Sequence, residues 1–290
     1  MSTIESSREV SGQFVVSAEE GKQRLLIEAQ RSERRHLIQT WCIRVGFIIL
    51  WLGSWQLFAA QRILNPVFIG EPSGIWHSFT GMLGGSVVTT DLRVTLFESI
   101  MGFLASLIIG LSVAYCFVRF SILERAFRPI VTAVNSVPRI ALIPIFIIWF
   151  GFGPMSKIAN IISFVTFTVL LGAIGAFTAS DRDHMLLSKV LGFNERERMW
   201  KFVIPNAVPA LANIFELALI YSFLGAITAE MLGGAQGVGV RLVLFANQYQ
   251  TNNYFAVLFL IVIVTVAIVQ GMRLLLKRFV KWREVEMRGE

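Results

Sequence analysis

Charged residues, cysteines and histidines are scarce in this chain of 290 residues. Only 16% of the residues are charged, against roughly a quarter in soluble globular domains, whereas 55% are hydrophobic and the mean hydropathy is +0.66. This composition predicts an all-α membrane protein and argues against a soluble enzyme. The two cysteines, Cys42 and Cys116, both lie in apolar stretches, so buried thiols are expected rather than a disulfide.

The motifs of common enzyme classes are missing as well. The three histidines, His36, His77 and His184, are never paired at metal-ligand spacing. The sequence contains no phosphate-binding Gly-x-x-x-x-Gly-Lys loop and no HExxH, CxxC or GxSxG motif. We therefore expect no catalytic residue, no metal site and no ATP hydrolysis by the chain itself.

Long uncharged runs predict the membrane-spanning helices. Residues 99–118 and 158–180 carry no charge, and a bilayer-spanning helix needs about 20 mostly apolar residues. Residues 140–156 and the later part of 242–272 are similarly apolar. The sequence predicts six transmembrane helices, at about 41–60, 97–119, 128–150, 156–179, 206–230 and 254–275.

Basic residues divide unevenly between the two sides of this arrangement. If the helices alternate in direction, 21 of the 26 lysines and arginines fall on the side that holds both termini. Because basic residues mark the cytoplasmic side, both termini are predicted to be cytoplasmic, and the net charge of +7 indicates topology rather than nucleic-acid binding. The expected domains are a cytoplasmic tail with an amphipathic helix at 1–40, a six-helix membrane domain at 41–276 with a long cytoplasmic loop at 181–205, and a cytoplasmic tail at 277–290.

Two of the predicted helices carry signs of packing or of a break. Pro138 and Pro144 each remove a backbone hydrogen bond from the third helix. Since interrupted membrane helices face protein or water, this region with Arg139 either lines a pathway or is an ordinary packed kink. The second helix has a stripe of small residues that allows another helix to approach closely. The stripe consists of Gly102, Ser106, Gly110 and Ala114.

Two acidic residues, Glu216 and Glu230, are expected within the fifth helix. They stand 14 residues apart, close to four helical turns, so both side chains point to about the same side. A charge near the bilayer centre costs about 3 kcal/mol on insertion scales, so this face is expected to turn toward a pathway or a subunit interface. Glu230, near the outer end, is a candidate gate or binding-protein contact, whereas Glu216, near the inner end, either joins the pathway or pairs with a basic residue.

The cytoplasmic loop 181–205 mixes charges with apolar residues at helical spacing. Gly192 ends a first apolar stripe, and a second short helix is expected at about 194–203, ending before Pro205. An apolar stripe in a charged loop is typical of a docking element for a soluble partner, and a hairpin lying on the membrane is the alternative.

Several segments resemble the permeases of binding-protein-dependent ABC importers. Leu191-Gly192, followed by Ile204-Pro205-Asn-Ala-Val-Pro209, resembles their coupling loop. Three further segments resemble the aliphatic-sulfonate, taurine, nitrate and bicarbonate group within that class. They are Asn135-Ser-Val-Pro138-Arg-Ile-Ala-Leu-Ile-Pro144, Ile148-Trp-Phe-Gly-Phe-Gly153 with Ser156-Lys157-Ile158, and Ala229-Glu230-Met231-Leu232 with Gly237-Val-Gly239. The resemblance covers about residues 92–283.

The resemblance implies a type I ABC importer permease in the bacterial inner membrane, without a cofactor because a partner subunit binds ATP. The implied partners are a dimer of cytoplasmic ABC ATPases, a second permease copy or a paralogue, an extracytoplasmic substrate-binding protein and membrane lipid, with no nucleic acid. The implied substrate is a small anion such as a sulfonate, taurine or nitrate. Segment 186–199 would enter a cleft of the ATPase. The residues expected to couple to it are Leu186, Leu187, Ser188, Leu191, Gly192, Phe193, Asn194 and Pro205.

Two positions depart from the family pattern. Relatives usually begin the coupling loop with Glu-Ala-Ala, but this chain has Leu186-Leu187-Ser188, so no role of that glutamate carries over. Where relatives commonly have arginine, this chain has Glu216, which weighs against copying their preference for anions. A stand-alone secondary transporter or channel is the alternative function, although the sequence shows no clear internal repeat.

Overall fold

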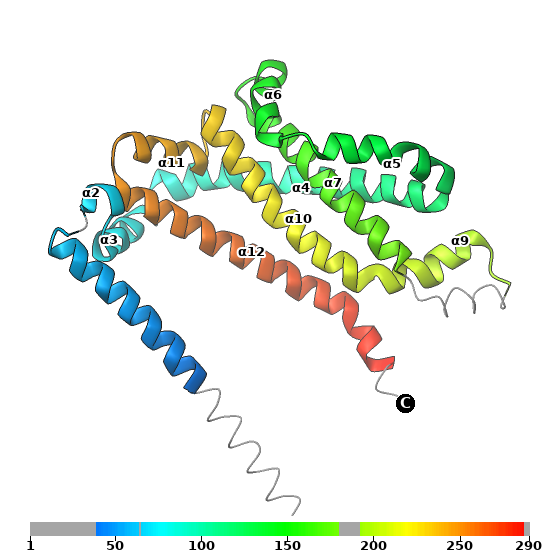
Figure 1. The fold of residues 1–290 in the computed structure, drawn as a ribbon, viewed down its shortest axis with the longest axis horizontal. Coiled ribbons are helices and arrows are strands. Elements are labelled where there is room, and N and C mark those ends of the chain that lie inside the picture. Colours follow the sequence, from blue (N-terminus) through cyan, green and yellow to red (C-terminus); the bar gives the residue numbers. More distant parts are fainter. Residues whose placement is uncertain (1–38, 64, 180–191, 287–290) are drawn as a thin grey trace, which may run out of the picture. The chain divides into compact units, whose positions relative to one another are not determined.

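The computed structural model describes residues 39–63, 65–179 and 192–286, and these ranges contain helices and turns but no strand (Figure 1). The chain divides into two compact units, Met1–Leu64 and Asn65–Glu290, which we describe separately. Within the described ranges, five helices are long and apolar enough to cross a membrane, and a bent pair of helices can make a sixth span. The predicted all-α membrane fold is confirmed.

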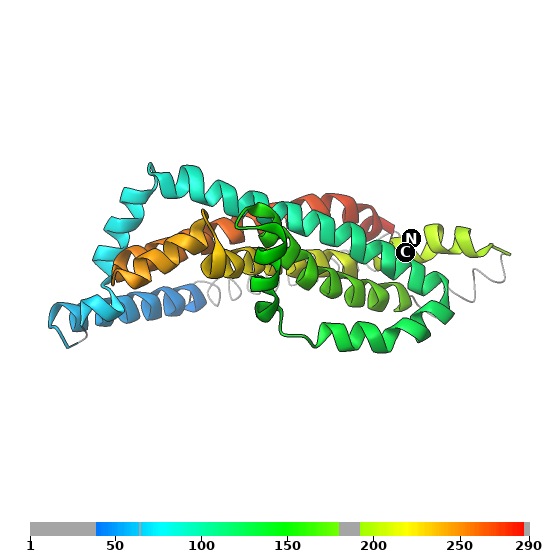
Figure 2. The same ribbon diagram turned by 90° about the horizontal axis from the view of Figure 1, so that it is seen from above.

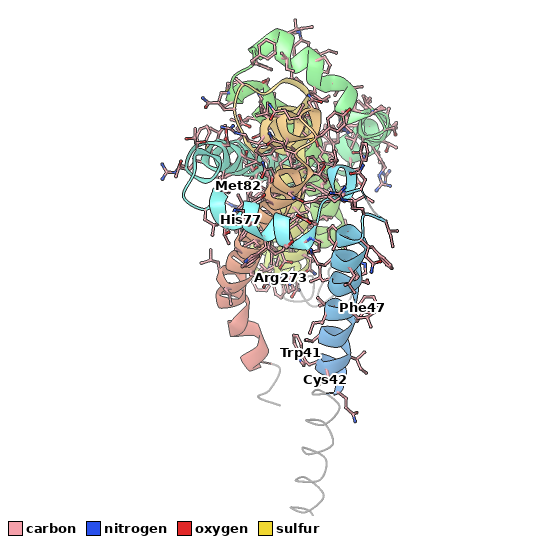
Figure 3. All side chains as sticks on the ribbon, turned by 90° about the vertical axis from the view of Figure 1, so that its left-hand side faces the viewer. Trp41, Cys42, Phe47, His77, Met82 and Arg273 are labelled. Atoms are coloured by element: carbon pink, nitrogen blue, oxygen red, sulfur yellow. The ribbon has the colours of Figure 1, made fainter. Side chains whose placement is uncertain are left out.

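The first unit has one apolar helix in its described part, Gln39–Ala60, which matches the first predicted span. Near its start, the Arg44 guanidinium carbon lies 5.7 Å from the centroid of the Trp41 ring. Figure 3 shows Trp41, Cys42 and Phe47 along this helix, and all three are exposed. The amphipathic helix predicted before this span lies outside the described residues.

The second unit begins with two short helices and continues with longer ones. Its first half contains α2 (Pro66–Ile69), α3 (Pro72–Met82), the π-turn η1 (Val87–Asp91), α4 (Leu92–Arg119), α5 (Ser121–Asn135), the 3-10 turn η2 (Arg139–Leu142) and α6 (Ile143–Phe150). Its second half contains α7 (Pro154–Thr178), α9 (Glu195–Arg198), the π-turn η3 (Met199–Val203), α10 (Ile204–Gly233), α11 (Val238–Asn247) and α12 (Thr251–Glu286). The last helix continues beyond its predicted end near residue 275.

Helices α4, α7 and α10 form the packed centre of the second unit. The predicted small-residue stripe of α4 is buried, and it faces α7, which lies beside α4 in Figure 2. A Cβ atom added to Gly102 would lie 2.6 Å from Cβ of Ile161, and one added to Gly110 would lie 2.8 Å from Cβ of Val169. The second contact is two turns further along both helices, so α4 and α7 run parallel. This register places Glu98 of α4 level with the start of α7.

We expect Gly110→Val to destabilise the protein by about 1–3 kcal/mol, because the added side chain overpacks the contact between α4 and Val169. The apparent melting temperature of the purified protein in detergent measures this effect. Gly175→Val is the matched control, since a Cβ at that helical glycine has no neighbour within 4 Å among the described residues outside its own helical turn. Equal losses in the two variants would contradict the packing described for α4.

The third predicted span is broken into two helices. Helix α5 ends at Asn135, and after a short turn η2 and α6 continue at an angle of 82° to it (Figures 1 and 2). The predicted break at Pro138 is confirmed. Pro144 makes no second kink, because it lies in the first turn of α6, where a proline needs no N–H. The helical segment also begins at Ser121, earlier than the predicted start near residue 128.

Both cysteines are exposed, which corrects the expectation of buried thiols. Cys116 lies on α4 between Ala114 and Phe117, which are buried, but on a different face of the helix. An apolar run does not reveal which of its faces packs against protein, because lipid is as apolar as a protein core.

Candidate functional site

A group of buried polar side chains joins α4, α7, α10 and α11, and we call it the polar cluster. Each of its members is exposed by 4% or less. The members are Asp91, Thr95, Glu98, Lys157 and Glu230. Burying this many charges in a membrane protein is costly unless each charge is paired or hydrogen-bonded, so the contacts of each member decide what the cluster does.

Glu230 holds the first turn of α11. One carboxylate oxygen accepts a hydrogen bond from the Thr95 hydroxyl at 2.6 Å, and the other accepts one from the Gly239 N–H at 2.7 Å. The Thr95 oxygen in turn accepts the Val238 N–H at 3.0 Å. The first N–H groups of a helix lack partners within the helix and attract negative charge. The Glu230 carboxylate, which α10 contributes, therefore stabilises the N-terminus of α11.

The glycines around Val238 leave room for this carboxylate. Gly237 has a φ of +117°, a conformation that residues with a side chain rarely adopt. A Cβ atom added to Gly237 would collide with the Glu230 carboxylate, and one added to Gly239 would lie 2.7 Å from Cβ of Glu230. The segment Gly237-Val-Gly239 and Glu230, which the sequence separates, thus form one packed unit.

Asp91 ties the start of α4 to α11. Its carboxylate accepts the Gly237 N–H at 3.3 Å and the Arg241 Nε–H at 2.6 Å. Three successive N–H groups, those of residues 237–239, therefore end on side chains of the polar cluster. Such a set of contacts fixes the position of α11 relative to α4 and α10.

Lys157 is the buried cation of the cluster. Its ammonium group donates to the carbonyl of Gly153 at 3.1 Å and to the carbonyl of Phe152, which holds the turn between α6 and α7. Its charge also interacts with the carboxyl groups of Glu98 and Glu230, although neither forms an ion pair with it. The cluster thereby links the α6–α7 turn to the start of α11.

Sequence reasoning singled out Glu230, missed Glu98, and noted Lys157 only as part of the family motif Ser156-Lys157-Ile158, without a role. Both residues stand beside the uncharged runs that predict the spans. A signal for both is present. Glu98 is one step of four residues before Gly102 and extends the small-residue stripe of α4. Lys157 begins a similar series on α7 whose later members are all buried. These members are Ile161, Val165, Val169 and Ala173.

The structure does not bring Glu216 and Glu230 together. Glu216 of α10 forms an ion pair with Arg273 of α12, with 2.7 Å between Oε2 and Nε (Arg273 is labelled in Figure 3). Glu230 is 1% exposed and contacts α4 and α11 instead. The pairing with a basic residue, one of the alternatives for Glu216, is present, and the pathway roles stay predictions.

Arg139 lies at the break between α5 and α6, between the exposed Pro138 and Pro144. Its Nη2 donates to Oδ1 of Asn135 at 3.2 Å, and its guanidinium carbon lies 4.8 Å from the centroid of the Phe167 ring. Phe167 stands in the middle of α7, so the guanidinium group sits about halfway along a membrane-spanning helix. A cation facing lipid at that depth costs about 3 kcal/mol, which favours water or protein beside it.

The first half of the predicted coupling loop lies outside the described residues, including Leu186, Leu187, Ser188 and Leu191. Gly192, in the described half, has a φ of +70°. The Asn194 side chain accepts the Glu197 N–H at 2.9 Å, and the Glu197 carboxylate accepts the Asn194 N–H at 3.1 Å. This reciprocal pair is a capping box, so a helix starts directly after Asn194. The Phe193 ring packs on Phe202 with 5.4 Å between centroids.

The helix that follows does not end before Pro205, which corrects the sequence interpretation. The π-turn η3 leads directly into α10, and the helix is continuous over Arg196–Gly233. Pro205 lies in the first turn of α10, and the wider π-turn before it accommodates a residue without an N–H.

Comparison with known protein families identifies the family to which this helical architecture belongs. Residues 106–283, more than half of the chain, match the family described as binding-protein-dependent transport system inner membrane component. The chain belongs to this permease family. The permease is therefore a transport component rather than a catalyst, and it is a multi-pass protein of the inner membrane, as predicted.

Individual relatives agree with this assignment. The permease is 26% identical over 233 residues to a putative aliphatic sulfonates transport permease of Bacillus subtilis, covering 80% of this chain and 84% of the relative. It is 24% identical over 238 residues to a formylaminopyrimidine transport permease of Halalkalibacterium halodurans, covering 82% and 94%. A chain of the inward-facing MetNI methionine ABC transporter has the same fold, with a TM-score of 0.59 at 19% identity over 69% of the permease and 97% of that chain. The predicted ABC importer permease fold is confirmed.

Proposed function

We propose that the permease forms a translocation pathway with a second permease subunit and that segment 186–199 couples it to a dimer of cytoplasmic ATPases. An extracytoplasmic binding protein would deliver the substrate. The uneven distribution of basic residues supports cytoplasmic termini, with the coupling segment on the same side. No observation on the described residues favours the alternative of a stand-alone transporter or channel.

The continuous helix Arg196–Gly233 is the observation that carries this proposal. It starts within the predicted coupling loop and ends beside Glu230 in the polar cluster. With a rise of about 1.5 Å per residue, such a helix reaches across the whole bilayer. A displacement of the loop by an ATPase would therefore move the far end of α10, and the cluster would pass the movement to α11.

The proposed substrate is a small anion such as a sulfonate, taurine or nitrate. The relative named for aliphatic sulfonates supports this class of substrate. Another relative of similar identity is named for formylaminopyrimidine, so the family includes permeases named for different substrates. The departure at Glu216 does not oppose an anion, because Arg273 offsets the negative charge.

The experiment that tests coupling is the purification of tagged Gly192→Trp from its native membrane in mild detergent. Wild type is expected to retain a nucleotide-binding ATPase, identified by mass spectrometry, and Gly192→Trp is expected to lose it. Among the described residues nothing beyond the chain neighbours lies within 4 Å of a Cβ built at Gly192, so the indole is expected to project away from the described part of the chain.

Two controls separate docking from folding. Gly192→Ala introduces the backbone strain of a positive φ without the bulk, and Gly81→Trp places the same bulk on α3, where a Cβ is equally unobstructed. Both are expected to retain the ATPase. Undiminished co-purification with Gly192→Trp would refute the docking role of this loop.

A further inference from the structure

We propose that Arg139 is the residue that gives the pathway its preference for anions, by presenting its guanidinium group to substrate oxygens at the break between α5 and α6. The inference rests on the proposed function and assigns its substrate class to one side chain. The ligand chemistry is that of sulfonate, carboxylate or phosphate oxygens, which match the planar N–H groups of arginine.

Unlike Lys157, Arg241 and Arg273, Arg139 has no carboxylate partner among the described residues. The charge of Lys157 interacts with the carboxyl groups of Glu98 and Glu230, while Arg241 and Arg273 each form an ion pair, at 2.6 Å and 2.7 Å. The contacts of Arg139 are instead the amide oxygen of Asn135 and the face of the Phe167 ring. An uncompensated positive charge is therefore available at this position.

The geometry leaves most of the guanidinium group free to bind a ligand. Arginine has five N–H donors, and the hydrogen bond to Asn135 uses one of them. The Phe167 ring supports the flat face of the guanidinium group, which leaves its edge for planar contacts with oxygen atoms. The side chain is half-buried, so Asn135 and Phe167 orient it without covering it.

The break that holds Arg139 exposes polar side chains beside the exposed apolar Val137 and Ile140. Asn135 and Ser136 are exposed at the same break. Irregular backbone at membrane depth occurs only against protein or a water-filled cavity. Together with the position of Phe167 halfway along α7, this places an unpaired cation where a substrate would cross the middle of the membrane.

The test uses a reporter cysteine at Ser136, with Cys42→Ala and Cys116→Ala removing the two exposed native thiols. The complete transporter in proteoliposomes is treated with two thiol reagents of similar size, a sulfonate-bearing methanethiosulfonate and its trimethylammonium counterpart. Rates are divided by the rates with a free thiol in solution. We expect the sulfonate reagent to be favoured by about tenfold, the lower end of what a focused charge achieves.

Arg139→Gln is expected to abolish this preference and Arg139→Lys to retain it. A second reporter, Thr178→Cys, at the exposed end of α7, is the matched control whose rate ratio should not respond to Arg139→Gln. If the Ser136 reporter reacts with both reagents but still prefers the sulfonate reagent in Arg139→Gln, the role of Arg139 is refuted. The accessibility of Ser136 would still support a pathway at the break. If neither reagent reaches Ser136, the break does not line a pathway and the role of Arg139 is refuted, whereas the coupling to an ATPase is tested separately by Gly192→Trp.

Discussion

Replacing Lys157 by methionine is expected to destabilise the permease by about 1–3 kcal/mol, because two carbonyl groups lose a charged donor and the carboxyl groups of Glu98 and Glu230 lose a nearby positive charge. Methionine keeps the apolar stem of the side chain, so the loss reports the charge and its hydrogen bonds rather than a cavity. The same change frees the carbonyl groups of Phe152 and Gly153 in the α6–α7 turn. The apparent melting temperature and the yield of folded protein in detergent measure the effect.

A double variant and an exposed lysine test this explanation. Lys157→Met combined with Glu98→Gln removes the buried cation together with one acidic group that interacts with it, and we expect the two losses of stability not to add. Lys201→Met removes a lysine that pairs with Glu197 at 3.5 Å in an exposed position, and it should cost less than about 1 kcal/mol. A loss for Lys157→Met no greater than for Lys201→Met would show that the buried charges are not interdependent.

The polar cluster also explains how the ends of four helices can act together. Lys157 holds the α6–α7 turn, Glu230 caps α11, and Asp91 attaches α11 to the start of α4. Removing one partner of such a network leaves the other polar groups buried without a hydrogen bond. The contacts therefore stabilise the fold cooperatively, and their individual contributions do not simply add. We therefore expect α6 and α11 to respond together when α10 moves.

The sequence was sufficient to predict five of the six spans as single helices, because the length of an apolar run in a membrane protein indicates whether it can cross the bilayer. It also predicted the break at Pro138, where the missing N–H and the ring of proline act locally. It failed at Pro205, since the adjustment there is a π-turn of the preceding residues, and proline alone does not show whether a helix ends or widens.

The polar cluster was predictable only in part. Glu230 was conspicuous as a charge inside an apolar run, whereas Glu98 and Lys157 stand at the edges of such runs and look like ordinary helix ends. Their burial follows from the register of α4 against α7, a tertiary contact between residues far apart in the sequence. The helices α3 and α11 were missed because both are too short to give a membrane-spanning signal.

Gly237→Ala is expected to cost about 2–4 kcal/mol of stability and to weaken the attachment of α11. Alanine at a φ of +117° is strained, which contributes on the order of 1–3 kcal/mol. Its Cβ would also collide with the Glu230 carboxylate, which must then give up its hydrogen bonds to Thr95 or Gly239. The apparent melting temperature measures the loss, and faster amide hydrogen exchange in α11 would locate it.

Double-mutant analysis separates the strain from the collision. In a Glu230→Ala background the carboxylate is gone, so Gly237→Ala should then cost only the backbone strain, and the difference between the two costs is the energy of the collision. Gly81→Ala, in α3 with no heavy atom within 4 Å of its Cβ, should instead be neutral or stabilising by up to about 1 kcal/mol. Equal costs of Gly237→Ala with and without Glu230 would mean that the glycine is needed for its backbone conformation alone. Unequal costs would show that Gly237 is glycine because Glu230 occupies the space of a side chain.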